Sequence, residues 1–106
     1  MAGDVRIPAH LEVAGLRRRV ESAGGFATIL NRGERDAGTI LVVCVENGAT
    51  IGLHERMPQM DGTRKWEEIL QKQDDAAAYL ERRGAQDPDL WIVELDIANG
   101  KRFVYE

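Results

Sequence analysis

Apolar residues recur at helical spacing in the first part of the chain. Val13, Leu16 and Val20 share one stripe, while polar side chains occupy the opposite side. This spacing is typical of an amphipathic helix, and the Gly24-Gly25 pair that follows suits a helix end. We therefore predict a helix over Leu11–Ala23.

The pattern then changes to short runs of β-branched and aromatic residues separated by turn signals, which predicts strands. The predicted strands are Phe26–Asn31, Thr39–Glu46, Ala49–Met57 and Leu90–Ile97. Arg32–Gly38 is predicted to be a connecting loop. Asn47-Gly48 and Asp61-Gly62 suit two-residue hairpin turns, because a type I′ turn needs positive φ at both central positions.

The stretch after the second of these turns fits two interpretations. Thr63–Ile69 can be a fourth strand or the start of one long helix, and periodicity does not decide between them. The preceding turn favours the strand, with a helix beginning near Asp74 and ending at Gly84. That helix is expected to bury Ala77 and Leu80.

The last part of the chain contains two more turn signals. Asp87-Pro88-Asp89 is predicted to be a turn before the last strand. Asn99-Gly100 is predicted to fold Arg102–Tyr105 back as a short hairpin. The terminal segments 1–9 and 98–106 are expected to be loosely ordered.

The resulting order is α-β-β-β-(β)-α-β. Two-residue turns force neighbouring strands to run antiparallel, because parallel neighbours need long crossovers. We therefore predict an α+β fold with two helices and an antiparallel meander sheet of four or five strands. The chain has 106 residues, which suits one domain over residues 1–106.

Ile40–Val45 is apolar on both faces of its strand, so we expect this strand in the middle of the sheet with a cover on each side. Two arrangements provide such covers. One helix can lie on each face, or both helices can lie on one face and a partner subunit on the other. Self-association is therefore one open hypothesis.

Composition narrows the function classes. The net charge is −4, whereas nucleic-acid binders usually carry a basic excess. Cys44 is the only cysteine, which excludes an intramolecular disulfide and cysteine-rich metal sites. Met1–Pro8 lacks the apolar core of a secretory signal, and the longest apolar run, Ile40–Val45, is too short to span a membrane. We therefore expect a cytoplasmic protein without membrane contact.

Three segments carry a family resemblance: GGFATILNRGERDAGTILV, the isolated Trp66 after a turn, and AAAYLERR followed by DPDLWIVELD. Together they resemble a family of small alphaproteobacterial proteins classed as domain of unknown function 1491. The resemblance covers roughly Leu11–Ile97, and DPDLW is its most specific part. It implies a short, stand-alone bacterial domain of the cytoplasm, and it brings no activity, ligand, partner or functional residue.

The loop between the first two predicted strands holds the densest group of charges. Arg32 and Arg35 beside Glu34 and Asp36 can clamp an anion such as phosphate. The alternative, which we favour, is a solvated loop with weak ion pairs. Trp66 is a candidate interface aromatic, because strand tryptophans that are partly exposed are enriched at interfaces.

Other candidates favour structural interpretations. Asp87, Asp89 and nearby Glu81 suggest a divalent metal site, but aspartates beside a proline are better explained as turn residues. His10 and His54 have no further ligand at metal spacing. We predict no metal, no cofactor and no nucleophilic catalysis, since Cys44 lies in an apolar strand, where burial makes a thiol inert.

The preferred hypothesis is a small binding or assembly module without catalysis, with its ligand unknown. The first alternative is a small enzyme or anion-binding domain centred on Arg32, Arg35 and Asp36, with Asp87 brought near by the fold. The second is a weak nucleic-acid binder through Arg17–Arg19. These three side chains fan around their helix, so nucleic-acid binding is the least favoured.

Overall fold

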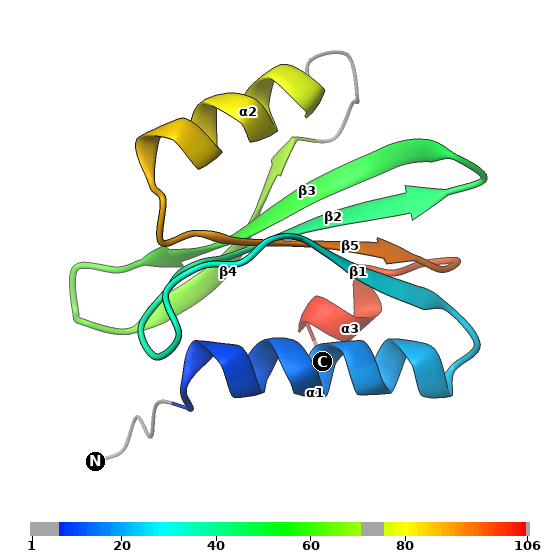
Figure 1. Ribbon diagram of the computed structural model, residues 1–106, viewed down its shortest axis with the longest axis horizontal. Coiled ribbons are helices and arrows are strands. Elements are labelled where there is room, and N and C mark those ends of the chain that lie inside the picture. Colours follow the sequence, from blue (N-terminus) through cyan, green and yellow to red (C-terminus); the bar gives the residue numbers. More distant parts are fainter. Residues whose placement is uncertain (1–6, 71–75, 106) are drawn as a thin grey trace.

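The computed structural model describes residues 7–70 and 76–105, which form a five-stranded sheet and three helices (Figure 1). The elements are α1 (Ala9–Ser22), β1 (Phe26–Asn31), β2 (Ile40–Glu46), β3 (Ala49–Pro58), β4 (Arg64–Leu70), α2 (Ala76–Gln86), β5 (Trp91–Asp96) and α3 (Arg102–Tyr105). The α+β class and the five predicted strands are confirmed, including β4, for which the sequence left a helix open. No helix among residues 7–70 and 76–105 is long and apolar enough to cross a membrane.

The sheet has the order β1-β5-β2-β3-β4 and is mixed. β5 lies between β1 and β2, antiparallel to β1 and parallel to β2, with Ile40 opposite Trp91. The remaining pairs, β2 with β3 and β3 with β4, are antiparallel. The predicted antiparallel meander is therefore wrong for β1 and β5, although it is right for β2, β3 and β4.

The physical reason is that β5 is a second interior strand. Trp91, Ile92 and Val93 are buried in succession, so β5 is covered on both faces and cannot lie at an edge. The segment that carries α2 joins β4 to β5 and is long enough to let β5 run parallel to β2.

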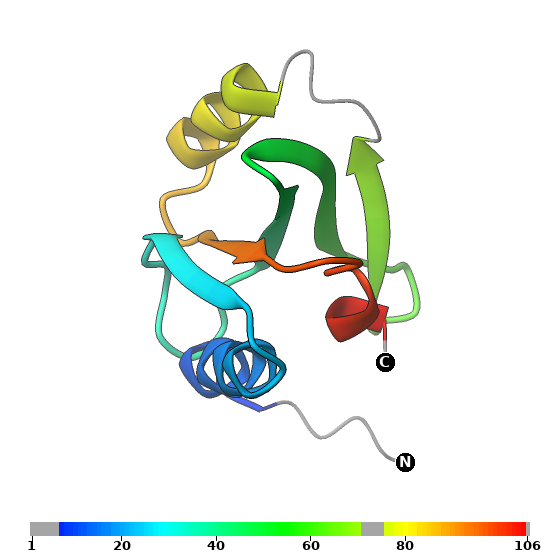
Figure 2. The ribbon, with the colours of Figure 1, turned by 90° about the vertical axis from the view of Figure 1, so that its right-hand side faces the viewer.

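Helices cover both faces of the sheet. α1 and α3 lie on one face and α2 lies on the other (Figure 2). Every residue of Ile40–Val45 is buried, which confirms the prediction that this strand is central. Even-numbered residues such as Val42 pack toward α1, and odd-numbered residues such as Val43 pack toward α2. Because helices of the chain itself pack on both faces of this strand, its burial no longer supports the hypothesis of a partner subunit.

The predicted two-residue turn is confirmed at Asn47-Gly48, whereas Asp61-Gly62 lies in a longer connection between Pro58 and Arg64, in which Asp61 does not have the positive φ of a type I′ turn. Asn47 and Gly48 have φ values of 52° and 80°, as a type I′ turn requires. Gly24 ends α1 with φ 94°. At the start of α1, the first main-chain N–H groups find their acceptors in the loop between β1 and β2. Ala9 N–H donates to the Asp36 carbonyl and His10 N–H to the Arg35 carbonyl, each at 2.9 Å.

Three predictions about the C-terminal half need correction. Arg102–Tyr105 forms the helix α3 rather than a hairpin strand. α2 continues past Gly84 to Gln86, and Ala77 is exposed because Ala76, not Ala77, faces the sheet. Leu80 is half-buried against the sheet as expected. The predicted helix start at Asp74 lies outside the described residues.

Candidate functional site

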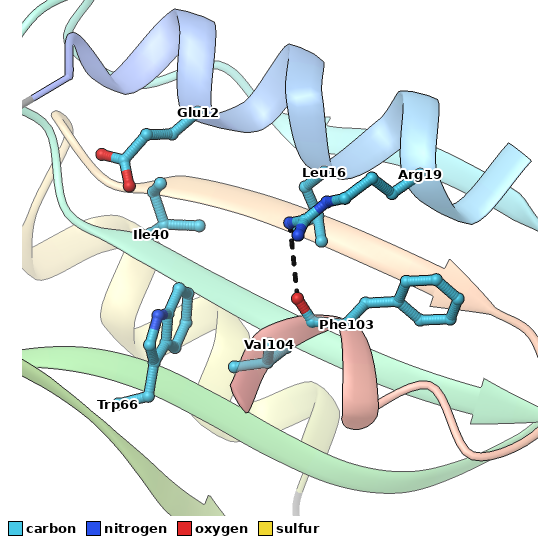
Figure 3. Close-up of a pocket in the computed structure, with 7 residues that line it drawn as sticks. All are labelled: Glu12, Leu16, Arg19, Ile40, Trp66, Phe103 and Val104. Atoms are coloured by element: carbon cyan, nitrogen blue, oxygen red, sulfur yellow. Dashed lines mark hydrogen bonds between the residues drawn. The ribbon is translucent and has the colours of Figure 1, made fainter. Parts of the chain in front are cut away.

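A cavity of about 180 Å³ opens where α1 and α3 face strands β2 and β4 (Figure 3). Its lining combines apolar side chains with two charged ones, and the lining residues are Glu12, Leu16, Arg19, Ile40, Trp66, Phe103 and Val104.

The apolar wall of this cavity is part of the hydrophobic core. Leu16 lies on the buried stripe of α1, and Ile40 begins the central strand β2. Val104 is buried on α3. Trp66 packs half-buried against this cluster, and in Figure 3 its ring rises from β4 toward α1. An apolar ligand group that enters the cavity would therefore displace water from a preformed apolar surface.

Arg19 joins the cavity to the C-terminal helix. Its Nη2 donates to the Phe103 carbonyl oxygen at 3.4 Å, which ties α3 to α1 (Figure 3). One long bond leaves the guanidinium with further N–H donors, because arginine carries five. Arg19 can therefore offer donors to an acceptor in the cavity while its stem packs beside Leu16.

The carboxylate of Glu12, at the other end of the cavity, is paired with arginine side chains. It forms an ion pair with Arg56 on β3, and its Oε1 lies 4.0 Å from Arg64 Nη2. The Arg56 side chain is only 6% exposed, and its guanidinium lies 5.8 Å from the ring centroid of Trp66, its partner across the strand pair. A buried charge requires such pairing.

The charged side chains that line the cavity are Arg19 and Glu12, and the Glu12 carboxylate is paired with Arg56. The Nε and Nη2 atoms of Arg56 are buried without a hydrogen-bond acceptor among the described residues. The cavity therefore offers the N–H donors of Arg19 to a small amphipathic anion, and its lining contains no Ser, Thr, Cys, Lys or His side chain.

A second cavity of about 180 Å³ lies beside the turn that precedes α3 and shares no lining residue with the first. Its lining is Cys44, Glu46, Ile51, Gly52, His54, Glu68, Asn99, Gly100 and Lys101. Burial raises the pKa of Cys44 to about 11, so this thiol is protonated and unreactive at neutral pH, as expected. No group of three or more His, Cys, Asp or Glu side chains within residues 7–70 and 76–105 can hold a metal ion.

The loop with the predicted anion clamp is packed as a structural element. The Arg32 guanidinium lies 5.5 Å from the ring centroid of Trp91, while Arg35 and Asp36 form an exposed pair at 3.8 Å. Glu34 Oε1 accepts the main-chain N–H groups of Asp36 and Ala37 at 3.1 and 2.6 Å. The hydrogen bonds of this loop therefore go to its own backbone and to the first main-chain N–H groups of α1.

Asp87 acts as a turn residue. Its Oδ1 accepts the Asp89 main-chain N–H at 3.1 Å, and its Oδ2 lies 4.0 Å from Arg83. The turn meets the β1–β2 loop through a bond from Glu34 N to Asp89 O of 2.9 Å. The fold therefore brings the two predicted regions together through main-chain atoms.

Of the predicted site residues, Trp66 is the one that lines the cavity beside α3. The sequence did not single out Glu12 or Arg56, because charged residues on a helix and a strand usually face solvent. A usable signal was the spacing of Arg56 and Trp66 on either side of the Asp61-Gly62 turn, which places them as cross-strand neighbours. Arg17–Arg19 diverge as expected: Arg17 pairs with Glu21 at 3.9 Å, whereas Arg19 faces the cavity.

Comparison with known proteins gives a family and several solved structures. The model of the family described as protein of unknown function (DUF1491) matches residues 7–105. A crystal structure of a DUF1491 family protein from Caulobacter crescentus is 35% identical, with a TM-score of 0.81, and the match covers 94% of this chain and 96% of that one. No curated protein matches the chain.

Two structures determined in solution agree with this match. An NMR structure of a DUF1491 family protein from C. crescentus is 34% identical, with a TM-score of 0.82, over 94% of both chains. The solution structure of protein Atu0922 from A. tumefaciens is 32% identical, with a TM-score of 0.77, over 93% of this chain and 92% of that one.

Proposed function

We propose that this chain, which belongs to the DUF1491 family of proteins of unknown function, is a cytoplasmic binding module without catalysis. Its ligand is a small amphipathic carboxylate held non-covalently in the cavity beside Trp66. The observation that carries this proposal is the placement of the Arg19 guanidinium at an otherwise apolar cavity whose one carboxylate, Glu12, is already paired with Arg56.

The size and the chemistry of the cavity limit the ligand. A volume of about 180 Å³ is below the roughly 300–1,000 Å³ of sites for drug-sized molecules, so it suits a single ring or a short chain. The ligand's apolar part would contact Leu16, Ile40 and Trp66, and its carboxylate would accept from Arg19. A dissociation constant of about 1 mM or tighter is reasonable for a ligand of this size, and 1 mM corresponds to a binding free energy of about −4 kcal/mol.

The test compares three probes that share a ring and differ in charge: benzoate, benzyl alcohol and benzylamine. Each is titrated into the 15N-labelled protein, and the indole N–H signals of Trp66 and Trp91 are followed. We expect benzoate to shift the Trp66 signal selectively, because Trp91 Nε1 is already bound to Glu34 O at 2.7 Å. Benzylamine should be the weakest of the three.

Two variants locate the site. Arg19→Gln removes one charge-assisted hydrogen bond of about 1.5–3 kcal/mol and should weaken benzoate at least tenfold. Arg82→Gln is the matched control, because Arg82 stacks on Tyr79 of α2, on the opposite face of the sheet. Equal affinity for the three probes, or equal loss in both variants, would contradict the proposal.

A second proposal, self-association, is supported by the free edge of the sheet at β1. This strand, FATILN, has no charged residue, and Phe26 and Leu30 are 71% and 49% exposed. β4, the strand at the other edge, carries Arg64–Lys65 and Glu67–Glu68, which protect an edge from pairing. We expect concentration-dependent dimers in light scattering that Thr28→Lys abolishes. A protein that stays monomeric at high micromolar concentration would exclude this mode.

A further inference from the structure

The second cavity continues into a wider hollow of about 400 Å³ beside α3. The two hollows share four lining residues, which come from β3, β4 and the turn before α3: His54, Glu68, Asn99 and Lys101. We call the joined space the His54 recess. It shares no lining residue with the cavity beside Trp66, so it is a separate place on the molecule.

His54 is a buried polar residue in the wall of this recess. It is 1% exposed, and the one hydrogen bond that the described residues give its side chain joins Nδ1 to the Tyr105 hydroxyl at 2.9 Å. Burial lowers the pKa of His54, so the ring is neutral at pH 7 and carries a single N–H. When the tyrosine hydroxyl donates to Nδ1, that N–H is on Nε2 and is a donor that requires an acceptor.

The rim of the recess carries one unpaired charge of each sign. Glu68 lies directly opposite His54 across the pair of β3 and β4, so both side chains lie on the same face of the sheet. Lys101 lies in the turn before α3. Both charged residues are exposed, and neither forms an ion pair with another described residue. The other carboxylate of the lining, Glu46, is engaged, since its Oε2 accepts the Asn99 main-chain N–H at 2.8 Å.

We infer that the His54 recess is a second binding site, which takes a small zwitterion such as a free α-amino acid. The ammonium group of the ligand donates to Glu68, and its carboxylate accepts from Lys101 and His54 Nε2. An apolar side chain of the ligand contacts Ile51, which lines the inner cavity and is 41% exposed. This site is independent of the proposed function.

The pairing of charges selects a zwitterion over a simple anion or a simple cation. An anion would pair with Lys101 and His54 but would lie beside the Glu68 carboxylate, and like charges repel. A cation would pair with Glu68 but would leave the His54 N–H without an acceptor. Arg102 does not change this balance, because its Nη1 already donates to the Asn99 carbonyl at 3.0 Å.

The space in the recess suits a ligand of this size. The inner cavity of about 180 Å³ is lined in part by Gly52 and Gly100, which leave room because they carry no side chain. Sites for drug-sized molecules have roughly 300–1,000 Å³, so the inner cavity accepts a smaller group, such as the side chain of one amino acid.

The experiment uses the full-length chain and three probes that share one carbon skeleton. L-valine carries both charges, isovalerate lacks the ammonium group, and L-valinamide lacks the carboxylate. Each is titrated into the 15N-labelled protein while the imidazole nitrogen signals are followed. The chain has two histidines, and His10 is the internal control, because its Nδ1 lies 3.0 Å from Arg35 O in another part of the fold. We expect L-valine to shift the Nε2 signal of His54 alone and to bind at least tenfold more tightly than the other probes.

Two variants assign the two charges of the ligand. Glu68→Gln should weaken L-valine at least tenfold and leave the effect of isovalerate on His54 unchanged, because isovalerate has no ammonium group. Lys101→Gln should weaken L-valine equally and leave L-valinamide unchanged. Glu67→Gln and Lys65→Gln are the matched controls, since both residues are exposed on β4 and line neither hollow. All four positions are exposed, so equal urea midpoints should show that the fold is intact.

Three outcomes would overturn the inference: equal affinity for the three probes, equal loss in Glu68→Gln and Glu67→Gln, or no shift of the His54 signals at high millimolar L-valine. L-valine that shifts only the Trp66 indole signal would place the ligand in the other cavity and would overturn it as well. Benzoate at Trp66 tests the proposed function in a separate titration, so either proposal can fail while the other stands.

Discussion

The side chains of His54 and Tyr105 are joined by a hydrogen bond of 2.9 Å between His54 Nδ1 and the tyrosine hydroxyl, although 51 positions separate them. Their rings meet edge to face, with centroids 5.4 Å apart. His54 lies on β3 and Tyr105 ends α3, so this contact and the Arg19–Phe103 bond hold the C-terminal helix from two sides. The helix in turn forms one wall of the cavity beside Trp66.

Removal of the Tyr105 hydroxyl should loosen this attachment. We expect Tyr105→Phe to lower the free energy of unfolding by about 0.5–1.5 kcal/mol, the usual net contribution of one hydrogen bond. Urea denaturation of Tyr105→Phe, His54→Gln and the double variant measures the coupling. If the two single losses simply add, the side chains do not interact.

His54 should make stability depend on pH. Burial lowers the pKa of His54 in the folded protein below its ordinary 6.5. At any pH between the folded-state pKa and the ordinary pKa, the unfolded chain therefore binds more protons than the folded one. Stability is therefore unaffected by His54 above about pH 6.5 and falls as the pH drops below it. Urea midpoints from about pH 7.5 to about pH 5 should fall less steeply in His54→Gln. An equally steep loss in this variant would show that other groups are responsible.

The ion pair between Glu55 and Arg83 should be the most costly one to break. Glu55 is 3% exposed, and the hydrogen bond that Arg83 donates to its carboxylate raises the pKa of Arg83, which holds the guanidinium in its charged form. Arg83→Met leaves a buried carboxylate without its partner and should cost about 3–5 kcal/mol. Arg35→Gln is the control, because its pair with Asp36 is exposed and should contribute less than about 1 kcal/mol. Similar losses in both variants would contradict this ranking.

Gly33 should tolerate no side chain. A Cβ there would lie 2.2 Å from Asp89 O and 2.6 Å from the Trp91 ring. Gly33→Ala should therefore cost about 1–3 kcal/mol, as other overpacked sites do. Thermal unfolding checks this against Gly84→Ala, which should stabilise by about 0.5–1 kcal/mol. An unchanged melting temperature in Gly33→Ala would mean that the loop moves away without cost.

Local chemistry explains why much of the chain could be predicted. Asn47-Gly48 encodes a turn through its own positive φ values, and the stripe of Val13, Leu16 and Val20 encodes a helix by spacing alone. The candidate site was only partly predictable. Trp66 stood out because it is aromatic and isolated, whereas Arg56 appears in the sequence as one more polar residue of a strand.

The sequence by itself determined β1, β2, β3 and β5, the first helix and the burial of Ile40–Val45, because each depends on neighbours within a few residues. Only the tertiary structure decided that β5 lies between β1 and β2, since a strand's pattern shows that it is buried but not which strand it pairs with. It also decided that Glu12 neutralises Arg56 beside a cavity. Such a charge is stable in the interior only when a distant element supplies its partner.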